Sequence, residues 1–121
     1  MIESGNEELG DEELRELARL SKEEKRRLKS AYGQLYSTVS EILFRNDPIG
    51  FNFDENTDEY EPEVGTILPR LQDCTILMDV RRTIHQEFVR WFDSDIAGPE
   101  DKYQRIAEEV WIAWKQHRLT S

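Results

Sequence analysis

The chain has 121 residues, a formal net charge of −10 and 10% aromatic residues. This length fits one compact domain, and the aromatic content argues against a fully disordered chain. The acidic balance disfavours a protein that binds nucleic acid or an anionic membrane, because both tasks need a basic surface. We therefore expect no direct contact with nucleic acid and none with a membrane.

The negative charge is concentrated in two segments. Residues 1–20 carry seven acidic and two basic side chains, and residues 46–63 carry seven acidic side chains and no basic one. These segments contribute −5 and −7, so the rest of the chain sums to +2. The charge is therefore a property of two segments and not of the whole surface.

The sequence predicts a soluble cytoplasmic protein. Cys74 is the single cysteine, which suits a reducing compartment. The first residues lack the basic start and apolar run of a signal peptide. The longest apolar run, residues 110–114, is too short to span a bilayer.

Apolar residues recur at three- and four-residue spacing along most of the chain. This period predicts an all-α fold, a small bundle of four to five helices with one long acidic loop. We expect a flexible acidic N-terminus over residues 1–10 and a single helical domain over residues 11–118.

Caps and prolines predict where the helices begin and end. Asp11 is a candidate cap for the first helix, and Ser21 with Glu24 forms a capping box that opens the second. Pro62 begins the third, and Pro69 breaks it near its end. The helices are predicted over residues 12–20, 21–45, 62–71, 76–92 and 99–117.

The helical pattern is interrupted between residue 46 and about residue 60. Asp47 followed by Pro48 favours a turn. Ile49, Phe51 and Phe53 then alternate with polar residues, so an extended segment would point these three side chains to one side. We therefore expect an acidic loop that has its own apolar anchor.

This acidic loop is the predicted binding site for a basic partner protein. Its carboxylates complement Lys and Arg side chains and would steer such a partner toward it. Solubility is the alternative explanation for the same charge. The predicted partner-binding residues are Phe51, Phe53, Asp54, Glu55, Asp58, Glu59, Glu61 and Glu63.

A metal site is an alternative use of the loop. Asn52, Asp54, Asp58 and Glu63 supply oxygen ligands of the kind that Ca²⁺ and Mg²⁺ prefer, and Glu63 stands at position twelve counted from Asn52. A calcium loop, however, needs Asp at position one and Gly at position six, where this chain has Thr57. A metal-dependent enzyme or sensor and an acidic DNA mimic therefore stand as the alternative functions.

No pattern of a catalytic site is present in the sequence. The glycines are isolated, which excludes a phosphate-binding glycine loop, and no nucleophile–base signature occurs. We expect a non-enzymatic protein without a cofactor.

The fourth predicted helix has a second apolar stripe beside its main one. Met78, Val89 and Phe92 form this stripe, which indicates either a central place in the bundle or a homodimer surface. We interpret His85, on the same stripe, as a packed histidine and Cys74 as a buried small residue.

The tryptophans divide between core and flank. Trp91 and Trp114 fall on the core faces of their helices, whereas Trp111 lies on a flank. Ile112 points away from the core face of the last helix, so we expect it to be exposed.

Three short motifs resemble a group of small uncharacterised bacterial helical domains. They are Asp47-Pro-Ile-Gly50, Asp58-Glu-Tyr60 and Ile67-Leu68, and the similarity runs from about residue 35 to residue 115. The resemblance implies a helical fold and no established activity, cofactor or catalytic residue. By analogy of size and charge with bacterial immunity proteins, we expect an interaction module such as an immunity or inhibitor protein.

Overall fold

The computed structural model describes residues 11–50 and 60–120, and every regular element in these ranges is helical. The prediction of an all-α bundle is therefore confirmed. Residues 1–10 and the part of the acidic loop from 51 to 59 lie outside the described residues. The described elements are α1 (Asp11–Tyr32), α2 (Gln34–Asn46), α3 (Glu61–Ile67), the 3₁₀ helix η2 (Leu68–Asp73), α4 (Leu77–Phe92), α5 (Ser94–Ala97), the 3₁₀ helix η3 (Glu100–Tyr103) and α6 (Gln104–Thr120).

The break between the first two helices lies at Gly33 and not at the predicted capping box. Helix α1 runs without interruption through residues 21–24, because no glycine or proline stops it before Tyr32. Gly33 has φ 57° and ψ −128°, a backbone conformation that residues with a Cβ rarely adopt. The predicted boundary at Ser21 and the predicted single helix over residues 21–45 are both wrong.

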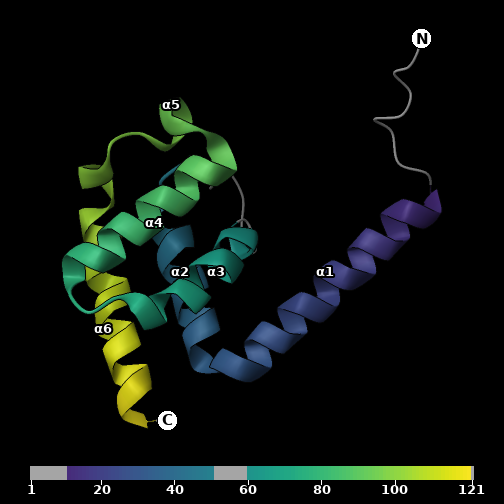
Figure 1. Ribbon diagram of the computed structural model, residues 1–121, viewed down its shortest axis with the longest axis horizontal. Helices are drawn as coiled ribbons and strands as arrows, with labels where there is room; N and C mark the ends of the chain where they lie inside the picture. Colours follow the sequence, from purple (N-terminus) through teal and green to yellow (C-terminus); the bar gives the residue numbers. More distant parts are fainter. Residues whose placement is uncertain (1–10, 51–59, 121) are drawn as a thin grey trace.

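Helices α2, α4 and α6 form the centre of the bundle. Helix α6 packs against both α2 and α4, and α3 with η2 packs against α4. Helix α1 runs away from this group, so that its N-terminal end lies far from the other helices (Figure 1). The core residues that are fully shielded from solvent include Val39, Leu43, Ile84, Phe88 and Val110.

The third predicted helix begins as expected and changes to a 3₁₀ helix near the predicted break at Pro69. Pro62 lies in the first turn of α3, where its missing N–H costs no hydrogen bond. Pro69 lies in the first turn of η2, at the change from α-helix to 3₁₀-helix. The prolines thus set both ends of this short helix.

The core face of α4 differs from the predicted one at Trp91, which is 47% exposed. Its buried residues are Val80, Thr83, Ile84, Glu87 and Phe88. At about 100° per residue, Trp91 falls on the same side of α4 as Val80 and Ile84. It lies in the last turn of α4, however, where its indole lines a surface groove and not the core, so the prediction that it packs in the core is wrong.

The other packing predictions on α4 and α6 are confirmed. Trp114 is buried, and Ile112 is exposed. His85 is a packed histidine, since its Nε2 lies 2.8 Å from the carbonyl oxygen of Gly98 and its ring lies 5.6 Å from that of Tyr103. Among the described residues, no helix is both long and apolar enough to cross a membrane.

Candidate partner-binding surface

The two ends of the acidic loop are joined by the side chain of Tyr60. Its hydroxyl donates to Oδ1 of Asp47 at 2.7 Å and accepts the backbone N–H of Ile49 at 3.1 Å. We call these two hydrogen bonds the Tyr60 clasp. They connect Tyr60 to positions thirteen and eleven residues earlier in the chain, so Asp47, Ile49 and Tyr60 lie together in the fold.

Both partners of the clasp are held by their own surroundings. Asp47 ends α2 in the left-handed conformation, with φ 49° and ψ 59°, and its N–H donates to the carbonyl of Leu43 at 2.8 Å. Tyr60 precedes α3, is 1% exposed, and its ring lies 5.9 Å from that of Phe88. The clasp therefore fixes the loop ends to the hydrophobic core.

The described part of the loop supports one predicted anchor. Ile49 is partly buried and packs against the core, in agreement with its predicted role. Phe51 and Phe53 lie outside the described residues, as do Asp54, Glu55, Asp58 and Glu59. Their predicted roles stay predictions.

The two remaining predicted residues, Glu61 and Glu63, lie in the first turn of α3 but in different environments. The side chain of Glu61 is 15% exposed and pairs with Lys25 Nζ at 2.6 Å. Glu63 is 4% exposed, and its Oε1 has no hydrogen-bond partner among the described residues. Burial raises the pKa of the Glu63 carboxyl, because a shielded carboxylate loses its hydration.

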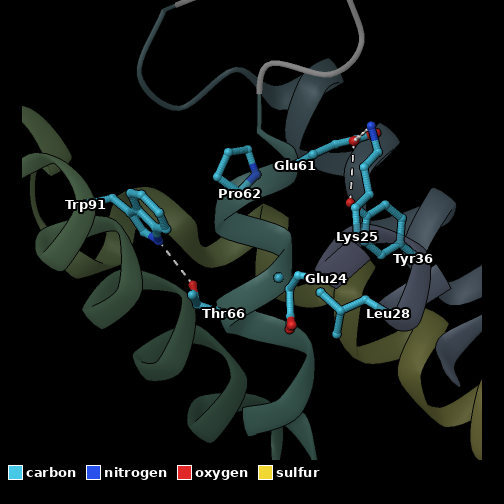
Figure 2. A pocket seen from close by; sticks show the side chains of 9 residues that line it. Glu24, Lys25, Leu28, Tyr36, Glu61, Pro62, Thr66 and Trp91 are labelled. Carbon is cyan, nitrogen blue, oxygen red and sulfur yellow. Dashed lines mark hydrogen bonds and ion pairs between the residues drawn. The ribbon is translucent and has the colours of Figure 1, made fainter. Parts of the chain in front are cut away.

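A groove runs along the exposed face of α3, beside Glu61. It has a volume of about 450 Å³. Pro62, Gly65 and Thr66 of α3 lie between residues of α1 on one side and Trp91 of α4 on the other (Figure 2). The lining residues are Glu24, Lys25, Leu28, Tyr36, Glu61, Pro62, Gly65, Thr66 and Trp91.

The exposed indole of Trp91 is held in place by Thr66. Its Nε1–H donates to the hydroxyl oxygen of Thr66 at 3.1 Å (Figure 2). This hydroxyl donates in turn to the carbonyl of Glu63 at 3.1 Å. A large aromatic side chain that is exposed but fixed loses little entropy when a partner covers it. Trp91 is therefore suited to a binding surface.

The opposite wall of the groove depends on a close approach between α1 and α3. A Cβ added at Gly65 would lie 3.2 Å from Cδ1 of Leu28, so the glycine gives α1 room to pack. Lys25 bridges to Glu61, and the Tyr36 hydroxyl donates to the same carboxylate at 3.4 Å (Figure 2). These contacts join three helices at the edge of the groove.

The structure gives no support to a metal site in its described part. Among residues 11–50 and 60–120, no group of three or more His, Cys, Asp or Glu side chains could hold a metal ion. Of the four predicted ligands, Asn52, Asp54 and Asp58 lie outside the described residues, and Glu63 is buried.

Cys74 is buried, as predicted, and its surroundings do not activate it. Its Sγ lies 3.5 Å from the hydroxyl of Thr83, and burial raises the pKa of the thiol. A raised pKa keeps the sulfur protonated and unreactive.

The second stripe of α4 is only partly exposed. Met78 is 43% exposed, whereas Val89 and Phe92 are partly buried against the core, and the Phe92 ring stacks 5.8 Å from Phe88. Homodimer formation through this stripe stays a prediction.

No family model matches the chain, and neither a curated protein nor a solved structure resembles it. Three residues of the Asp47-Pro-Ile-Gly50 and Asp58-Glu-Tyr60 motifs are nevertheless hydrogen-bonded to one another in the fold. Asp47, Ile49 and Tyr60 are the three residues of the clasp.

Replacing Tyr60 with Phe tests the clasp directly. The substitution keeps the ring but leaves the Ile49 N–H and Asp47 Oδ1 without the hydroxyl, so we expect a loss of roughly 1–3 kcal/mol of stability. Urea denaturation followed by circular dichroism measures the change. Tyr32→Phe is the control, because Tyr32 is half-buried and we expect its variant to unfold as the unchanged protein does. Equal stability of the two variants would contradict the clasp.

Glu63→Gln tests the buried carboxyl. Burial raises the pKa of Glu63 above its ordinary value of 4.5. Between that value and the raised pKa, Glu63 therefore holds its proton more often in the folded protein than in the unfolded chain. Stability therefore falls as the pH rises through this window, and it is highest when Glu63 is protonated. We expect Glu63→Gln to raise the Tm at pH 7 and to leave it nearly unchanged at pH 4.

The matched control for this experiment is Glu61→Gln. Like Glu63→Gln, it removes one carboxylate next to Pro62, but it also breaks the ion pair with Lys25. We therefore expect the free energy of unfolding to stay equal or to fall by about 0–1 kcal/mol. A lower Tm for Glu63→Gln at pH 7 would show that the Glu63 carboxylate is stabilised by the fold.

Proposed function

We propose that the protein is a non-enzymatic cytoplasmic interaction module that binds a basic partner protein, in the manner of an immunity or inhibitor protein. The proposed surface combines the acidic residues of the loop with the groove along α3. The observation that carries the proposal is the position of the exposed, fixed Trp91 in a groove edged by Glu61, the residue that directly follows the clasp.

The charge of the segment supports a basic partner. Residues 46–63 carry seven acidic and no basic side chains, whereas the chain outside the two acidic segments sums to +2. A concentrated negative charge raises the rate at which a positively charged protein arrives, and salt weakens this attraction. The clasp supports the proposal because it ties the two described ends of the segment, at Asp47 and Tyr60, to each other.

The groove supplies the contacts that hold the partner after it arrives. Aromatic side chains, tryptophan above all, carry a large share of the binding energy in protein interfaces when a partner covers them. Leu28, Pro62 and Trp91 give the groove an apolar lining, while Glu24 and Glu61 place carboxylates beside it. A partner segment with an apolar side chain next to Lys or Arg is complementary to this arrangement. Glu63 is buried, so the proposed surface does not include its carboxylate.

The first test is affinity capture from the host lysate at low salt, with unchanged protein and a loop variant. We expect a basic protein to be retained by the unchanged chain and lost, at least tenfold, by the variant, because four charges are removed from the loop. The loop substitutions are Asp54→Asn, Glu55→Gln, Asp58→Asn and Glu59→Gln. The control removes four charges near the N-terminus by Glu3→Gln, Glu7→Gln, Glu8→Gln and Glu12→Gln.

The second part of the test measures the affinity of the purified partner for Trp91→Ala. We expect a loss of about tenfold or more, which corresponds to roughly 1.4 kcal/mol. Ile112→Ala is the control, since Ile112 is also exposed but lies on α6. Capture that is equal for the loop variant and its N-terminal control would refute the role of the loop, and equal affinity for both alanine variants would refute the role of the groove.

A further inference from the structure

Away from the groove edge, α4 holds a carboxylate in the interior between two arginines. Glu87 is 1% exposed, and Nη1 of Arg70 lies 2.8 Å from its Oε2. Nη1 of Arg90 lies 3.3 Å from each of the two carboxylate oxygens. Removing a charge from water is costly unless it is paired, and the two arginines provide the paired charge for the buried carboxylate of Glu87.

These two arginines line a hollow of about 540 Å³. The other lining residues are His85, Gln86, Glu87 and Val89. Gln86 Oε1 accepts a second hydrogen bond from Arg70 at 2.7 Å, and His85 is bonded to Gly98. With two guanidinium groups and one carboxylate, the lining carries a net charge of +1 in a protein whose total is −10.

Arg90 retains donors that the described part of the protein does not use. Its side chain is 73% exposed, and only Nη1 makes hydrogen bonds to residues in the described ranges. Nε and Nη2 therefore remain as a fork of parallel N–H donors. Such a fork matches the spacing of two oxygens in a carboxylate or phosphate group.

We propose that this hollow is a binding site for a small organic anion that carries a carboxylate or phosphate group. Arg90 binds two oxygens of the anion through Nε and Nη2, and Arg70, which also lines the hollow, contributes positive charge. Glu87 positions both arginines without contacting the ligand. This site is basic, and none of its lining residues lines the groove. The proposal of an anion site therefore does not depend on the proposal of a basic partner protein.

The test is a titration of the full ¹⁵N-labelled chain with inorganic phosphate and, separately, with acetate, at constant ionic strength set with sodium chloride. We expect saturable chemical-shift changes at the Arg90 Nε–H and at the amides of residues 85–90 and of Arg70. The ligand that gives the tighter dissociation constant identifies whether the site prefers phosphate or carboxylate.

Two substitutions at Arg90 decide whether the fork binds the anion. Arg90→Gln is expected to weaken binding at least tenfold, and Arg90→Lys, which keeps the charge but lacks the fork, is expected to weaken it by a smaller factor. Arg105→Gln is the control, because Arg105 is also strongly exposed and pairs with a glutamate on its own helix. Its affinity for the anion is expected to stay unchanged.

Several results would overturn the proposal. They are shift changes that do not saturate, changes centred away from the hollow, and equal affinity of the Arg90→Lys variant and the unchanged protein. The dispersion of the α4 amide signals shows in the same spectra whether each variant remains folded.

Discussion

The hydroxyl of Tyr60 is the contact on which the arrangement of the binding surface depends. It lies in the interior, and it ties the end of α2 to the start of α3 through Asp47 and Ile49. A phenol suits this place because its ring packs against Phe88 while its hydroxyl satisfies two polar groups. Without the hydroxyl, both groups would lose this hydrogen bond, and the end of α2 would no longer be tied to the start of α3.

The Tyr60 clasp affects the groove through α3, because Tyr60 directly precedes this helix and residues of α3 line the groove. Helix α3 has only seven residues, too few to be stable alone, so its place is set by its contacts with the neighbouring helices. At its start lies the Tyr60 clasp, and along its length Gly65 admits Leu28 of α1. Thr66 then places the indole of Trp91. The groove is thus a consequence of how a short helix is held between longer ones.

Electrostatic interactions in the described part follow two patterns. Glu87 is buried with two arginines as partners, whereas Glu63 is buried with its Oε1 unpaired. The first arrangement fixes charged side chains at a surface hollow. The second makes the protein more stable when the carboxyl is protonated, because the raised pKa reflects a loss of hydration without a compensating charge.

Much of the fold could be predicted from helical periodicity, because long amphipathic segments such as α4 and α6 bury one face in the core. The break at Gly33 was missed since the apolar spacing continues across it, although the glycine itself was the available signal. Periodicity gives the direction of a side chain but not how far along a helix the core extends, so it could not show that Trp91, in the last turn of α4, is exposed. It also could not show that Glu87 is buried, because that burial depends on pairing with Arg70 and Arg90.

The candidate site was predictable only in part. The charge of residues 46–63 is visible in the sequence, but the clasp joins residues that local spacing does not connect. The groove likewise requires residues from four helices to meet, among them Lys25, Tyr36, Gly65 and Trp91. A local pattern of charge or hydrophobicity does not predict which residues of distant helices come together. Ile49 was predicted as an apolar anchor of the segment, whereas the tyrosine at its end, Tyr60, was a signal that the prediction did not use.

The most direct measurement of the central claim is native-state hydrogen exchange at the Ile49 amide. The amide donates to the hydroxyl of Tyr60, whose side chain is buried, so it should exchange only in rare openings, with a free energy close to that of global unfolding. Exchange at the rate of an unstructured peptide would show that the clasp does not hold the loop ends together, and it would contradict the account of the surface built on it.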